Sequence, residues 1–113
     1  MVGGVKPMRE PTFLILTALA EGPRHGYGIL REVADLSGGR VRLLTGTLYT
    51  ALDRLSAEGL VALDREEVVD GRGRRYFRLT AAGLGALTAE AARLRELASA
   101  AERRLRGART RLA

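Results

Sequence analysis

The segment from Thr45 to Gly59 is followed at once by two short apolar segments joined by a glycine- and arginine-rich turn, and few folds accommodate this order. Leu48, Leu52 and Leu55 recur at spacings of four and three, which places them on one face of a helix. The opposite face carries hydroxyl, phenol, carboxylate and guanidinium groups from Thr47, Tyr49, Thr50, Asp53 and Arg54. Such groups can bond phosphate oxygens and base edges. We therefore expect the leucines to face a core and the polar side to fit the major groove of DNA, with Thr45 as the N-cap.

The two apolar segments after this helix are typical of an antiparallel hairpin. Leu60–Leu63 and Tyr76–Leu79 read as its strands, and Gly59 ends the preceding helix. Asp70-Gly71 and Gly73 are expected to supply the positive φ angles of the turn. The sequence therefore predicts a hairpin whose tip runs from Val69 to Arg74.

Two further helices are expected before the segment that begins at Thr45. The run from Phe13 to Ala20 is apolar nearly all round, and Gly22-Pro23 ends it. A second helix should extend from about Gly26 to Ser37, where Gly38-Gly39 ends it. Its expected buried stripe comprises Tyr27, Leu30, Val33 and Ala34, with Ile29 beside it, while Arg31, Glu32 and Asp35 are left to water.

Three helices followed by a hairpin make a winged helix-turn-helix the economical architecture, mainly α with a small β hairpin. We expect one domain over residues 11–79, preceded by a flexible end over residues 1–10 and followed by a long helix with a basic tail over residues 80–113. The second and third helices would form the turn motif.

The last segment carries a pattern typical of a dimerisation helix. Leucines and alanines alternate at steps of three and four, as in a heptad seam. A helix from Thr80 to Arg106 would be roughly 40 Å long, which is too long for a single small domain to cover. We therefore expect a second copy of the chain to cover it; the alternative is that the helix folds back over its own domain. The expected interface comprises Leu84, Leu87, Ala91, Leu94, Leu97, Ala98, Ala101 and Leu105.

Composition excludes several other classes of protein. The 113 residues contain no cysteine and one histidine, His25, so neither a metal site nor a cofactor is expected. No serine lies in a catalytic pattern and no glycine-rich loop follows a strand, which argues against an enzyme. No apolar run is long enough for a membrane span, and the last helix lacks the bulky face of a membrane-surface helix. We expect a cytoplasmic protein.

The formal net charge of +6 gives only partial support to nucleic-acid binding. Residues 80–113 hold seven basic and three acidic side chains, which is +4 of this total. The local clusters in the first two-thirds of the chain are therefore more informative. They are Arg40 and Arg42 before the third helix, and Arg72, Arg74, Arg75 and Arg78 at the hairpin.

Several short motifs together resemble the PadR family of transcriptional regulators, over roughly residues 11–105. They are His25-Gly26-Tyr27, Gly46-Thr47-Leu48-Tyr49, Leu52-Asp53-Arg54-Leu55, Glu58-Gly59-Leu60, and Gly71 to Thr80 followed by Gly83. Thr50 stands where that family usually has proline, and Gly28 where it usually has a larger residue.

The resemblance implies a dimeric DNA-binding repressor, often relieved by a small molecule or a stress signal. By position, Thr47 and Tyr49 would face DNA, Tyr27 would brace its backbone, and Gly73-Arg74 would lie in the wing. Packing of the Tyr49 ring against its neighbours Leu52 and Asp53, and burial of Tyr27 in the core, are the alternatives. An effector slot lined by aromatic rings, as in relatives that capture flat drugs, is not indicated, because residues 80–113 contain no Trp, Phe or Tyr. An acidic effector near Arg93 and Arg95 is the alternative.

We therefore expect a homodimeric regulator, most simply a repressor, that binds a palindromic operator in double-stranded DNA and is released by a small molecule or stress signal. A winged helix that binds only another protein is the alternative. The expected DNA contacts are Tyr27, Arg40, Arg42, Thr45, Thr47, Tyr49, Thr50, Arg54, Arg72, Gly73, Arg74 and Arg75.

Overall fold

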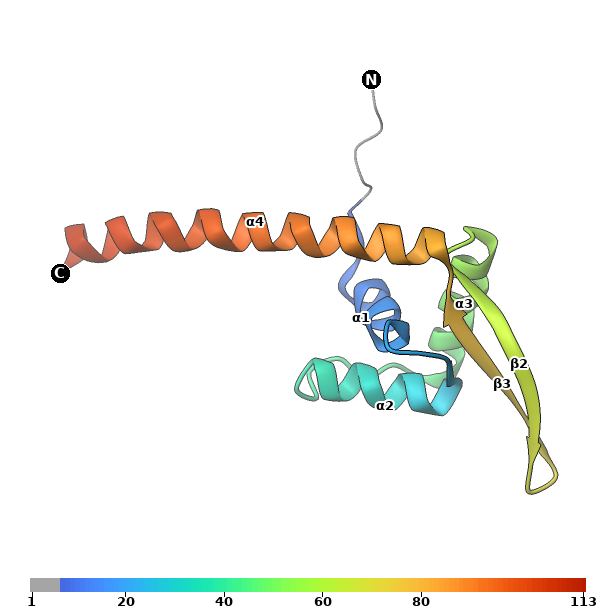
Figure 1. Ribbon diagram of the computed structural model, residues 1–113. Coiled ribbons are helices and arrows are strands. Elements are labelled where there is room, and N and C mark those ends of the chain that lie inside the picture. The colour runs from blue at the N-terminus through green and yellow to red at the C-terminus, as the bar shows by residue number, and fades with distance from the viewer. Residues whose placement is uncertain (1–6) are drawn as a thin grey trace.

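The computed structural model describes residues 7–113 and contains a small helical body, a projecting hairpin and one long helix (Figure 1). Along the chain the elements are α1 (Glu10–Leu19), β1 (Arg24–His25), α2 (Gly26–Leu36), α3 (Thr45–Ala57), β2 (Val61–Val69), β3 (Arg72–Leu79) and α4 (Ala81–Leu112). The predicted winged helix-turn-helix with a long C-terminal helix is confirmed.

The core forms where the three short helices meet the base of the hairpin. Buried apolar side chains come from α1, from α2, from the leucine face of α3 and from β2 and β3 of the hairpin. They are Leu14, Ile15, Leu16, Ala18, Leu19, Ile29, Val33, Leu48, Leu52, Leu55, Val61 and Phe77. The expected burial of the three α3 leucines is thus confirmed. Tyr27 is different, because 66% of it is exposed, and its assignment to the buried stripe was wrong.

The hairpin is longer than predicted and belongs to a three-stranded antiparallel sheet in the order β1-β3-β2. The two residues of β1 pair with Phe77 and Tyr76 of β3, so the start of α2 is joined to the wing. Asp70 (φ 51°) and Gly71 (φ 74°) form the turn. The expectation of a positive φ at Gly73 was wrong, because Gly73 already pairs with Val68 in the ladder.

The start of α4 is fixed against the end of α3. The Thr80 side chain accepts a hydrogen bond from the Gly83 amide (3.0 Å) and donates one to the Gly59 carbonyl (2.6 Å), and the Thr80 amide donates to the Leu60 carbonyl (3.1 Å). Thr80 is therefore both the N-cap of α4 and the joint between wing, α3 and α4.

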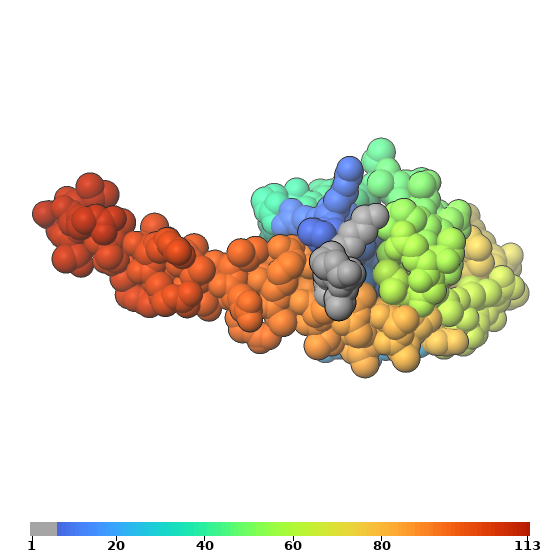
Figure 2. All heavy atoms as spheres, turned by 90° about the horizontal axis from the view of Figure 1, so that it is seen from above, coloured from blue at the N-terminus to red at the C-terminus, as the bar shows by residue number. Residues whose placement is uncertain are grey.

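Only the first part of α4 packs on the body. Leu87 lies against the core, and Glu90 is buried, where it pairs with Arg93 and accepts from the Met8 amide. Beyond this point α4 extends away from the domain, as both views show (Figures 1 and 2), and the molecule spans 64 × 37 × 22 Å. Residues 1–6 of the predicted flexible end lie outside the described residues.

Candidate nucleic-acid interface

The polar side of α3 is open, as the leucine spacing predicted. Gly46, Thr47, Thr50 and Asp53 are exposed, whereas Leu48, Leu52 and Leu55 are fully buried. The helix begins at Thr45, and its N-cap is Leu44, which has an extended backbone and provides no side-chain hydrogen bond. The predicted capping role of Thr45 was therefore wrong. Among the described residues no side chain caps the amides of the first turn, and such amides are good donors to an anion.

Tyr49 does not lie with this open side. It is half-buried and packs against the core, its ring centroid 6.3 Å from that of Phe77 in an edge-to-face arrangement. The Arg75 guanidinium carbon lies 5.3 Å from the centre of the Tyr49 ring. The expectation that the phenol points away from the fold was wrong, because position 49 faces the wing.

The start of α2 is held by the side chain of the single histidine. His25 Nδ1 accepts from the Gly28 amide (3.1 Å), so the neutral ring carries its proton on Nε2. Burial, and then the nearby charge of Arg74, lower the pKa of His25 from its ordinary value of 6.5. The ring also meets Tyr76 edge-on, at 5.3 Å between centroids. His25 therefore caps α2 and contacts the wing, and within residues 7–113 no cluster of side chains is suited to a metal.

Two of the predicted DNA-binding arginines are engaged by the fold. Arg40 forms a two-pronged ion pair with Glu10 at the start of α1, and this hydrogen bonding lowers the pKa of the Glu10 carboxyl. Arg54 donates to Thr12 Oγ1 (2.9 Å) and pairs with Glu58 (3.4 Å). The Arg40 side chain is 64% exposed and that of Arg54 is 49% exposed, but DNA would have to displace their partners in the fold to bind them.

The arginines of the wing tip and of the loop before α3 are less committed. Arg72, Arg74 and Arg75 are exposed, and in the described part of the chain neither they nor Arg42 form an ion pair. Nearer the base of the wing, Arg65 stacks over Tyr76 at 4.0 Å and pairs with Asp64 and Glu67. The wing tip and the loop before α3 thus carry arginines without an ion pair in the described residues, as does the part of α4 beyond Arg93.

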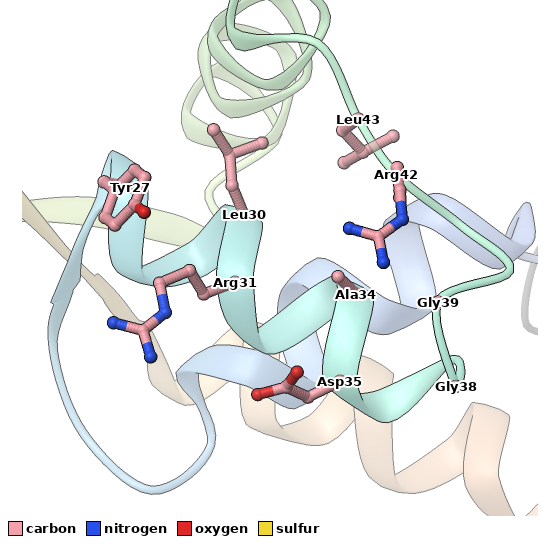
Figure 3. Close-up of a pocket in the computed structure, with 9 residues that line it drawn as sticks. All are labelled: Tyr27, Leu30, Arg31, Ala34, Asp35, Gly38, Gly39, Arg42 and Leu43. Carbon is pink, nitrogen blue, oxygen red and sulfur yellow. The ribbon is translucent and has the colours of Figure 1, made fainter.

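An open groove of about 600 Å³ runs along α2 beside the loop that leads to α3 (Figure 3). Leu30, Ala34 and Leu43 contribute its apolar part. Tyr27 stands at one end of it and Arg42 at the other, while Arg31 and Asp35 point outward from α2. The Arg31 guanidinium carbon lies 5.9 Å from the centre of the Tyr27 ring. Sequence reasoning left Arg31 to water and had no signal that α2 and the loop enclose a groove.

The predicted dimer residues fall into two groups. Leu87 and Ala91 lie partly buried near the body, whereas Leu94, Leu97, Ala98, Ala101 and Leu105 lie on the projecting part of α4. In this subunit Leu97 is 56% exposed and Leu105 is 50% exposed. Leu84 is also exposed, and it lies beside the α1–β1 turn. No helix in residues 7–113 is both long and apolar enough to cross a membrane.

Comparison with known proteins identifies relatives of the whole winged domain. The model of the transcriptional regulator PadR-like family matches residues 15–89. Transcriptional regulator Rv3488 of Mycobacterium tuberculosis is 44% identical over 84 residues, which cover 74% of this chain and 75% of that protein. A PadR family transcriptional regulator from Eggerthella lenta superposes with a TM-score of 0.68 at 29% identity, covering 83% of this chain and 80% of that one.

Bacillus subtilis PadR, solved in complex with operator DNA, shares the fold with a TM-score of 0.63 at 23% identity. The match covers 71% of this chain and 45% of that chain. The family match ends at residue 89, so the projecting part of α4 lies outside it. From α1 to the first turns of α4, the chain belongs to the PadR-like family of transcriptional regulators.

Proposed function

We propose that this protein is a sequence-specific, double-stranded DNA-binding transcriptional regulator that acts as a homodimer. The observation that carries the proposal is the arrangement of α3 and the wing. The exposed hydroxyls of Thr47 and Thr50 lie on a helix whose N-cap residue provides no side-chain hydrogen bond. The neighbouring hairpin ends in arginines that form no ion pair with any residue of the range 7–113. The wing tip and α2 both lie on the side of the molecule away from α4 (Figure 1).

This arrangement suits the two grooves of one duplex. A helix can enter the major groove, and a narrow basic turn can approach the minor groove or the backbone beside it. Thr47 and Thr50 would read bases, Arg42 and the wing arginines would bind phosphates, and Tyr27 would touch the backbone. The relative solved with operator DNA has the same fold, which supports this use of the surface.

The proposal of a homodimer is supported by the projecting part of α4. Exposed leucines on a helix that leaves its own domain lose apolar hydration if a second copy covers them. A two-fold dimer would present two α3 helices, and the matching operator would have half-sites about one helical turn apart in a palindrome. A repressor of this form would be released when a small molecule or a stress signal changes the dimer.

The decisive experiment is selection of bound fragments from a genomic DNA pool, followed by footprinting and by light scattering of the free protein. We expect a palindromic site, two protected half-sites and a dimer mass. If no fragment is retained even at low salt, the surface serves another partner, and the winged-helix protein-interaction module takes the place of this proposal.

A further inference from the structure

The side chain of Tyr49 fills the space between the start of α2 and the inner face of the wing. A Cβ atom on Gly26 would lie 2.5 Å from the Tyr49 hydroxyl oxygen and 3.0 Å from the ring carbon that bears it. Gly26 is buried, so this hydroxyl reaches into the fold. Glycine at position 26 leaves the room that the phenol occupies.

The other side of the same ring meets β3. Its edge-to-face contact with Phe77 has an angle of 65° between the two planes, a geometry that favours attraction between aromatic rings. The Arg75 guanidinium carbon lies 5.3 Å from the Tyr49 ring centre and 5.7 Å from the Phe77 ring centre. Arg75 and Phe77 are two residues apart, so they share one face of the strand. One side chain of α3 thus joins α2 to the wing.

The position of this contact matters because the hairpin projects freely beyond it (Figure 1). From Phe77 to the turn at Gly71 the strand is about 20 Å long, at roughly 3.3 Å per residue. A tilt of about 10° at the base would move the tip by about 3 Å, which is more than a hydrogen bond tolerates. The angle at the base of the hairpin would therefore decide whether the tip arginines reach DNA when α3 is in its groove.

We propose that Tyr49 is a positioning residue that fixes the angle between the wing and α3, so that both can engage the same duplex. It acts through Phe77 and Arg75 and does not itself read a base. This inference rests on the proposed DNA-binding function. If Tyr49 contacted DNA directly, its loss would weaken binding independently of the wing arginines. If Tyr49 positions the wing, its loss also removes the contribution of the wing arginines to affinity.

The test is a double-mutant cycle on the operator fragment recovered by selection. In the wild-type background, Arg74→Ala should weaken binding several-fold. In the Tyr49→Leu background, which is itself about tenfold weaker, Arg74→Ala should have almost no further effect. Thr50→Ala is the matched control on α3, and it should cost the same in both backgrounds. Tyr49→Phe keeps the ring and should retain most of the affinity. If Arg74→Ala weakens both backgrounds equally, Tyr49 does not position the wing.

A second readout does not depend on DNA. Amide hydrogen exchange in β2 and β3 should be faster in Tyr49→Leu than in the wild type or Tyr49→Phe, because the hairpin loses one of its supports at the base while the pairing with β1 remains. Tyr27→Leu, at an exposed tyrosine, is the control and should leave this exchange unchanged. Unchanged exchange in Tyr49→Leu would overturn the inference. Failure of the wild type to bind any DNA would instead overturn the proposed function, and the exchange experiment would still decide the role of Tyr49.

Discussion

The Cα of Gly83 lies so close to the chain at Leu60 that a Cβ atom on it would be 2.0 Å from the Leu60 carbonyl oxygen. The obstacle is backbone, so it cannot rotate away as a side chain could. The same carbonyl already accepts from the Thr80 amide, which fixes the turn after α3 against the start of α4. Contact at this point requires glycine and couples the winged domain to the long helix.

Gly83→Ala should therefore destabilise the protein although alanine favours helices. Overpacking of this kind typically costs about 1–3 kcal/mol, and a backbone obstacle places the expected loss in the upper part of that range. Urea unfolding followed by circular dichroism would measure it.

Gly85→Ala is the matched control for this change. Gly85 lies two residues further along α4, and a Cβ there would meet nothing within 4 Å. Removing glycine from a helix interior should stabilise by roughly 0.5–1 kcal/mol. Equal effects of the two substitutions would show that the approach to Leu60 is relaxed in solution.

Capping by His25 should make stability depend on pH. The cap needs an unprotonated Nδ1, and burial together with Arg74 lowers the pKa of His25 below 6.5. The unfolded chain then binds the proton more readily than the folded protein, so stability rises with pH in this window. The contribution is complete above pH 6.5 and is lost as the pH falls through the lowered pKa.

The urea concentration at the unfolding midpoint of the wild type should accordingly decrease as the pH is lowered from about 7 to about 5. His25→Asn is the control, because asparagine can cap a helix without titrating in this range. Lowered pKa values of Glu10, Glu67 and Glu90 act below their ordinary value of 4.5, so they contribute little here. A midpoint that changes equally in both proteins would exclude the histidine as the cause.

Local patterns were sufficient to predict the helices, and contacts between distant segments account for most of what sequence reasoning missed. The spacing of Leu48, Leu52 and Leu55 predicted the buried face of α3 correctly, because a helix repeats every 3.6 residues. Tyr49 lies about 100° around the helix from Leu48, on the flank that contacts Phe77 and Arg75 of the wing. Nothing local to the sequence shows where the wing will pack.

The other differences have either tertiary or local causes. The two residues of β1 are too few for any strand periodicity, and their pairing with β3 depends on the tertiary fold. The helical part of α3 begins at Thr45 itself, so the threonine cannot serve as its own N-cap. Glu90 was not predicted in the α4 stripe because a carboxylate is usually exposed. Its burial is offset by Arg93 and the Met8 amide.

The projecting part of α4 should be required for dimerisation but not for folding. Leu97→Glu places a charge on a side chain that is 56% exposed in the subunit, so the domain should keep its stability. In a dimer the same charge would be buried without a partner, which is costly. Light scattering should show a monomer for this variant and a dimer for the wild type.

Arg95→Glu is the control for this experiment, because Arg95 is exposed on α4 outside the predicted seam. It makes a larger change in charge and should still leave a dimer. A dimer of Leu97→Glu, with unchanged affinity for the full palindrome, would place the interface elsewhere on the molecule.

Arg74 and Arg40 should respond differently to removal, although both were predicted to bind DNA. Arg74 is exposed at the wing and forms no ion pair within the described chain, so its charge is available to a phosphate. Each phosphate contact releases counterions, so Arg74→Ala should reduce the slope of log affinity against log salt by about 0.9 per subunit. Arg40 is held by Glu10, and Arg40→Ala should leave that slope unchanged.

Titrations of one operator fragment over a salt series would measure the slopes of both variants. The same loss of slope for the two variants would mean that DNA takes Arg40 from Glu10, and that the ion pair of the free protein opens on binding.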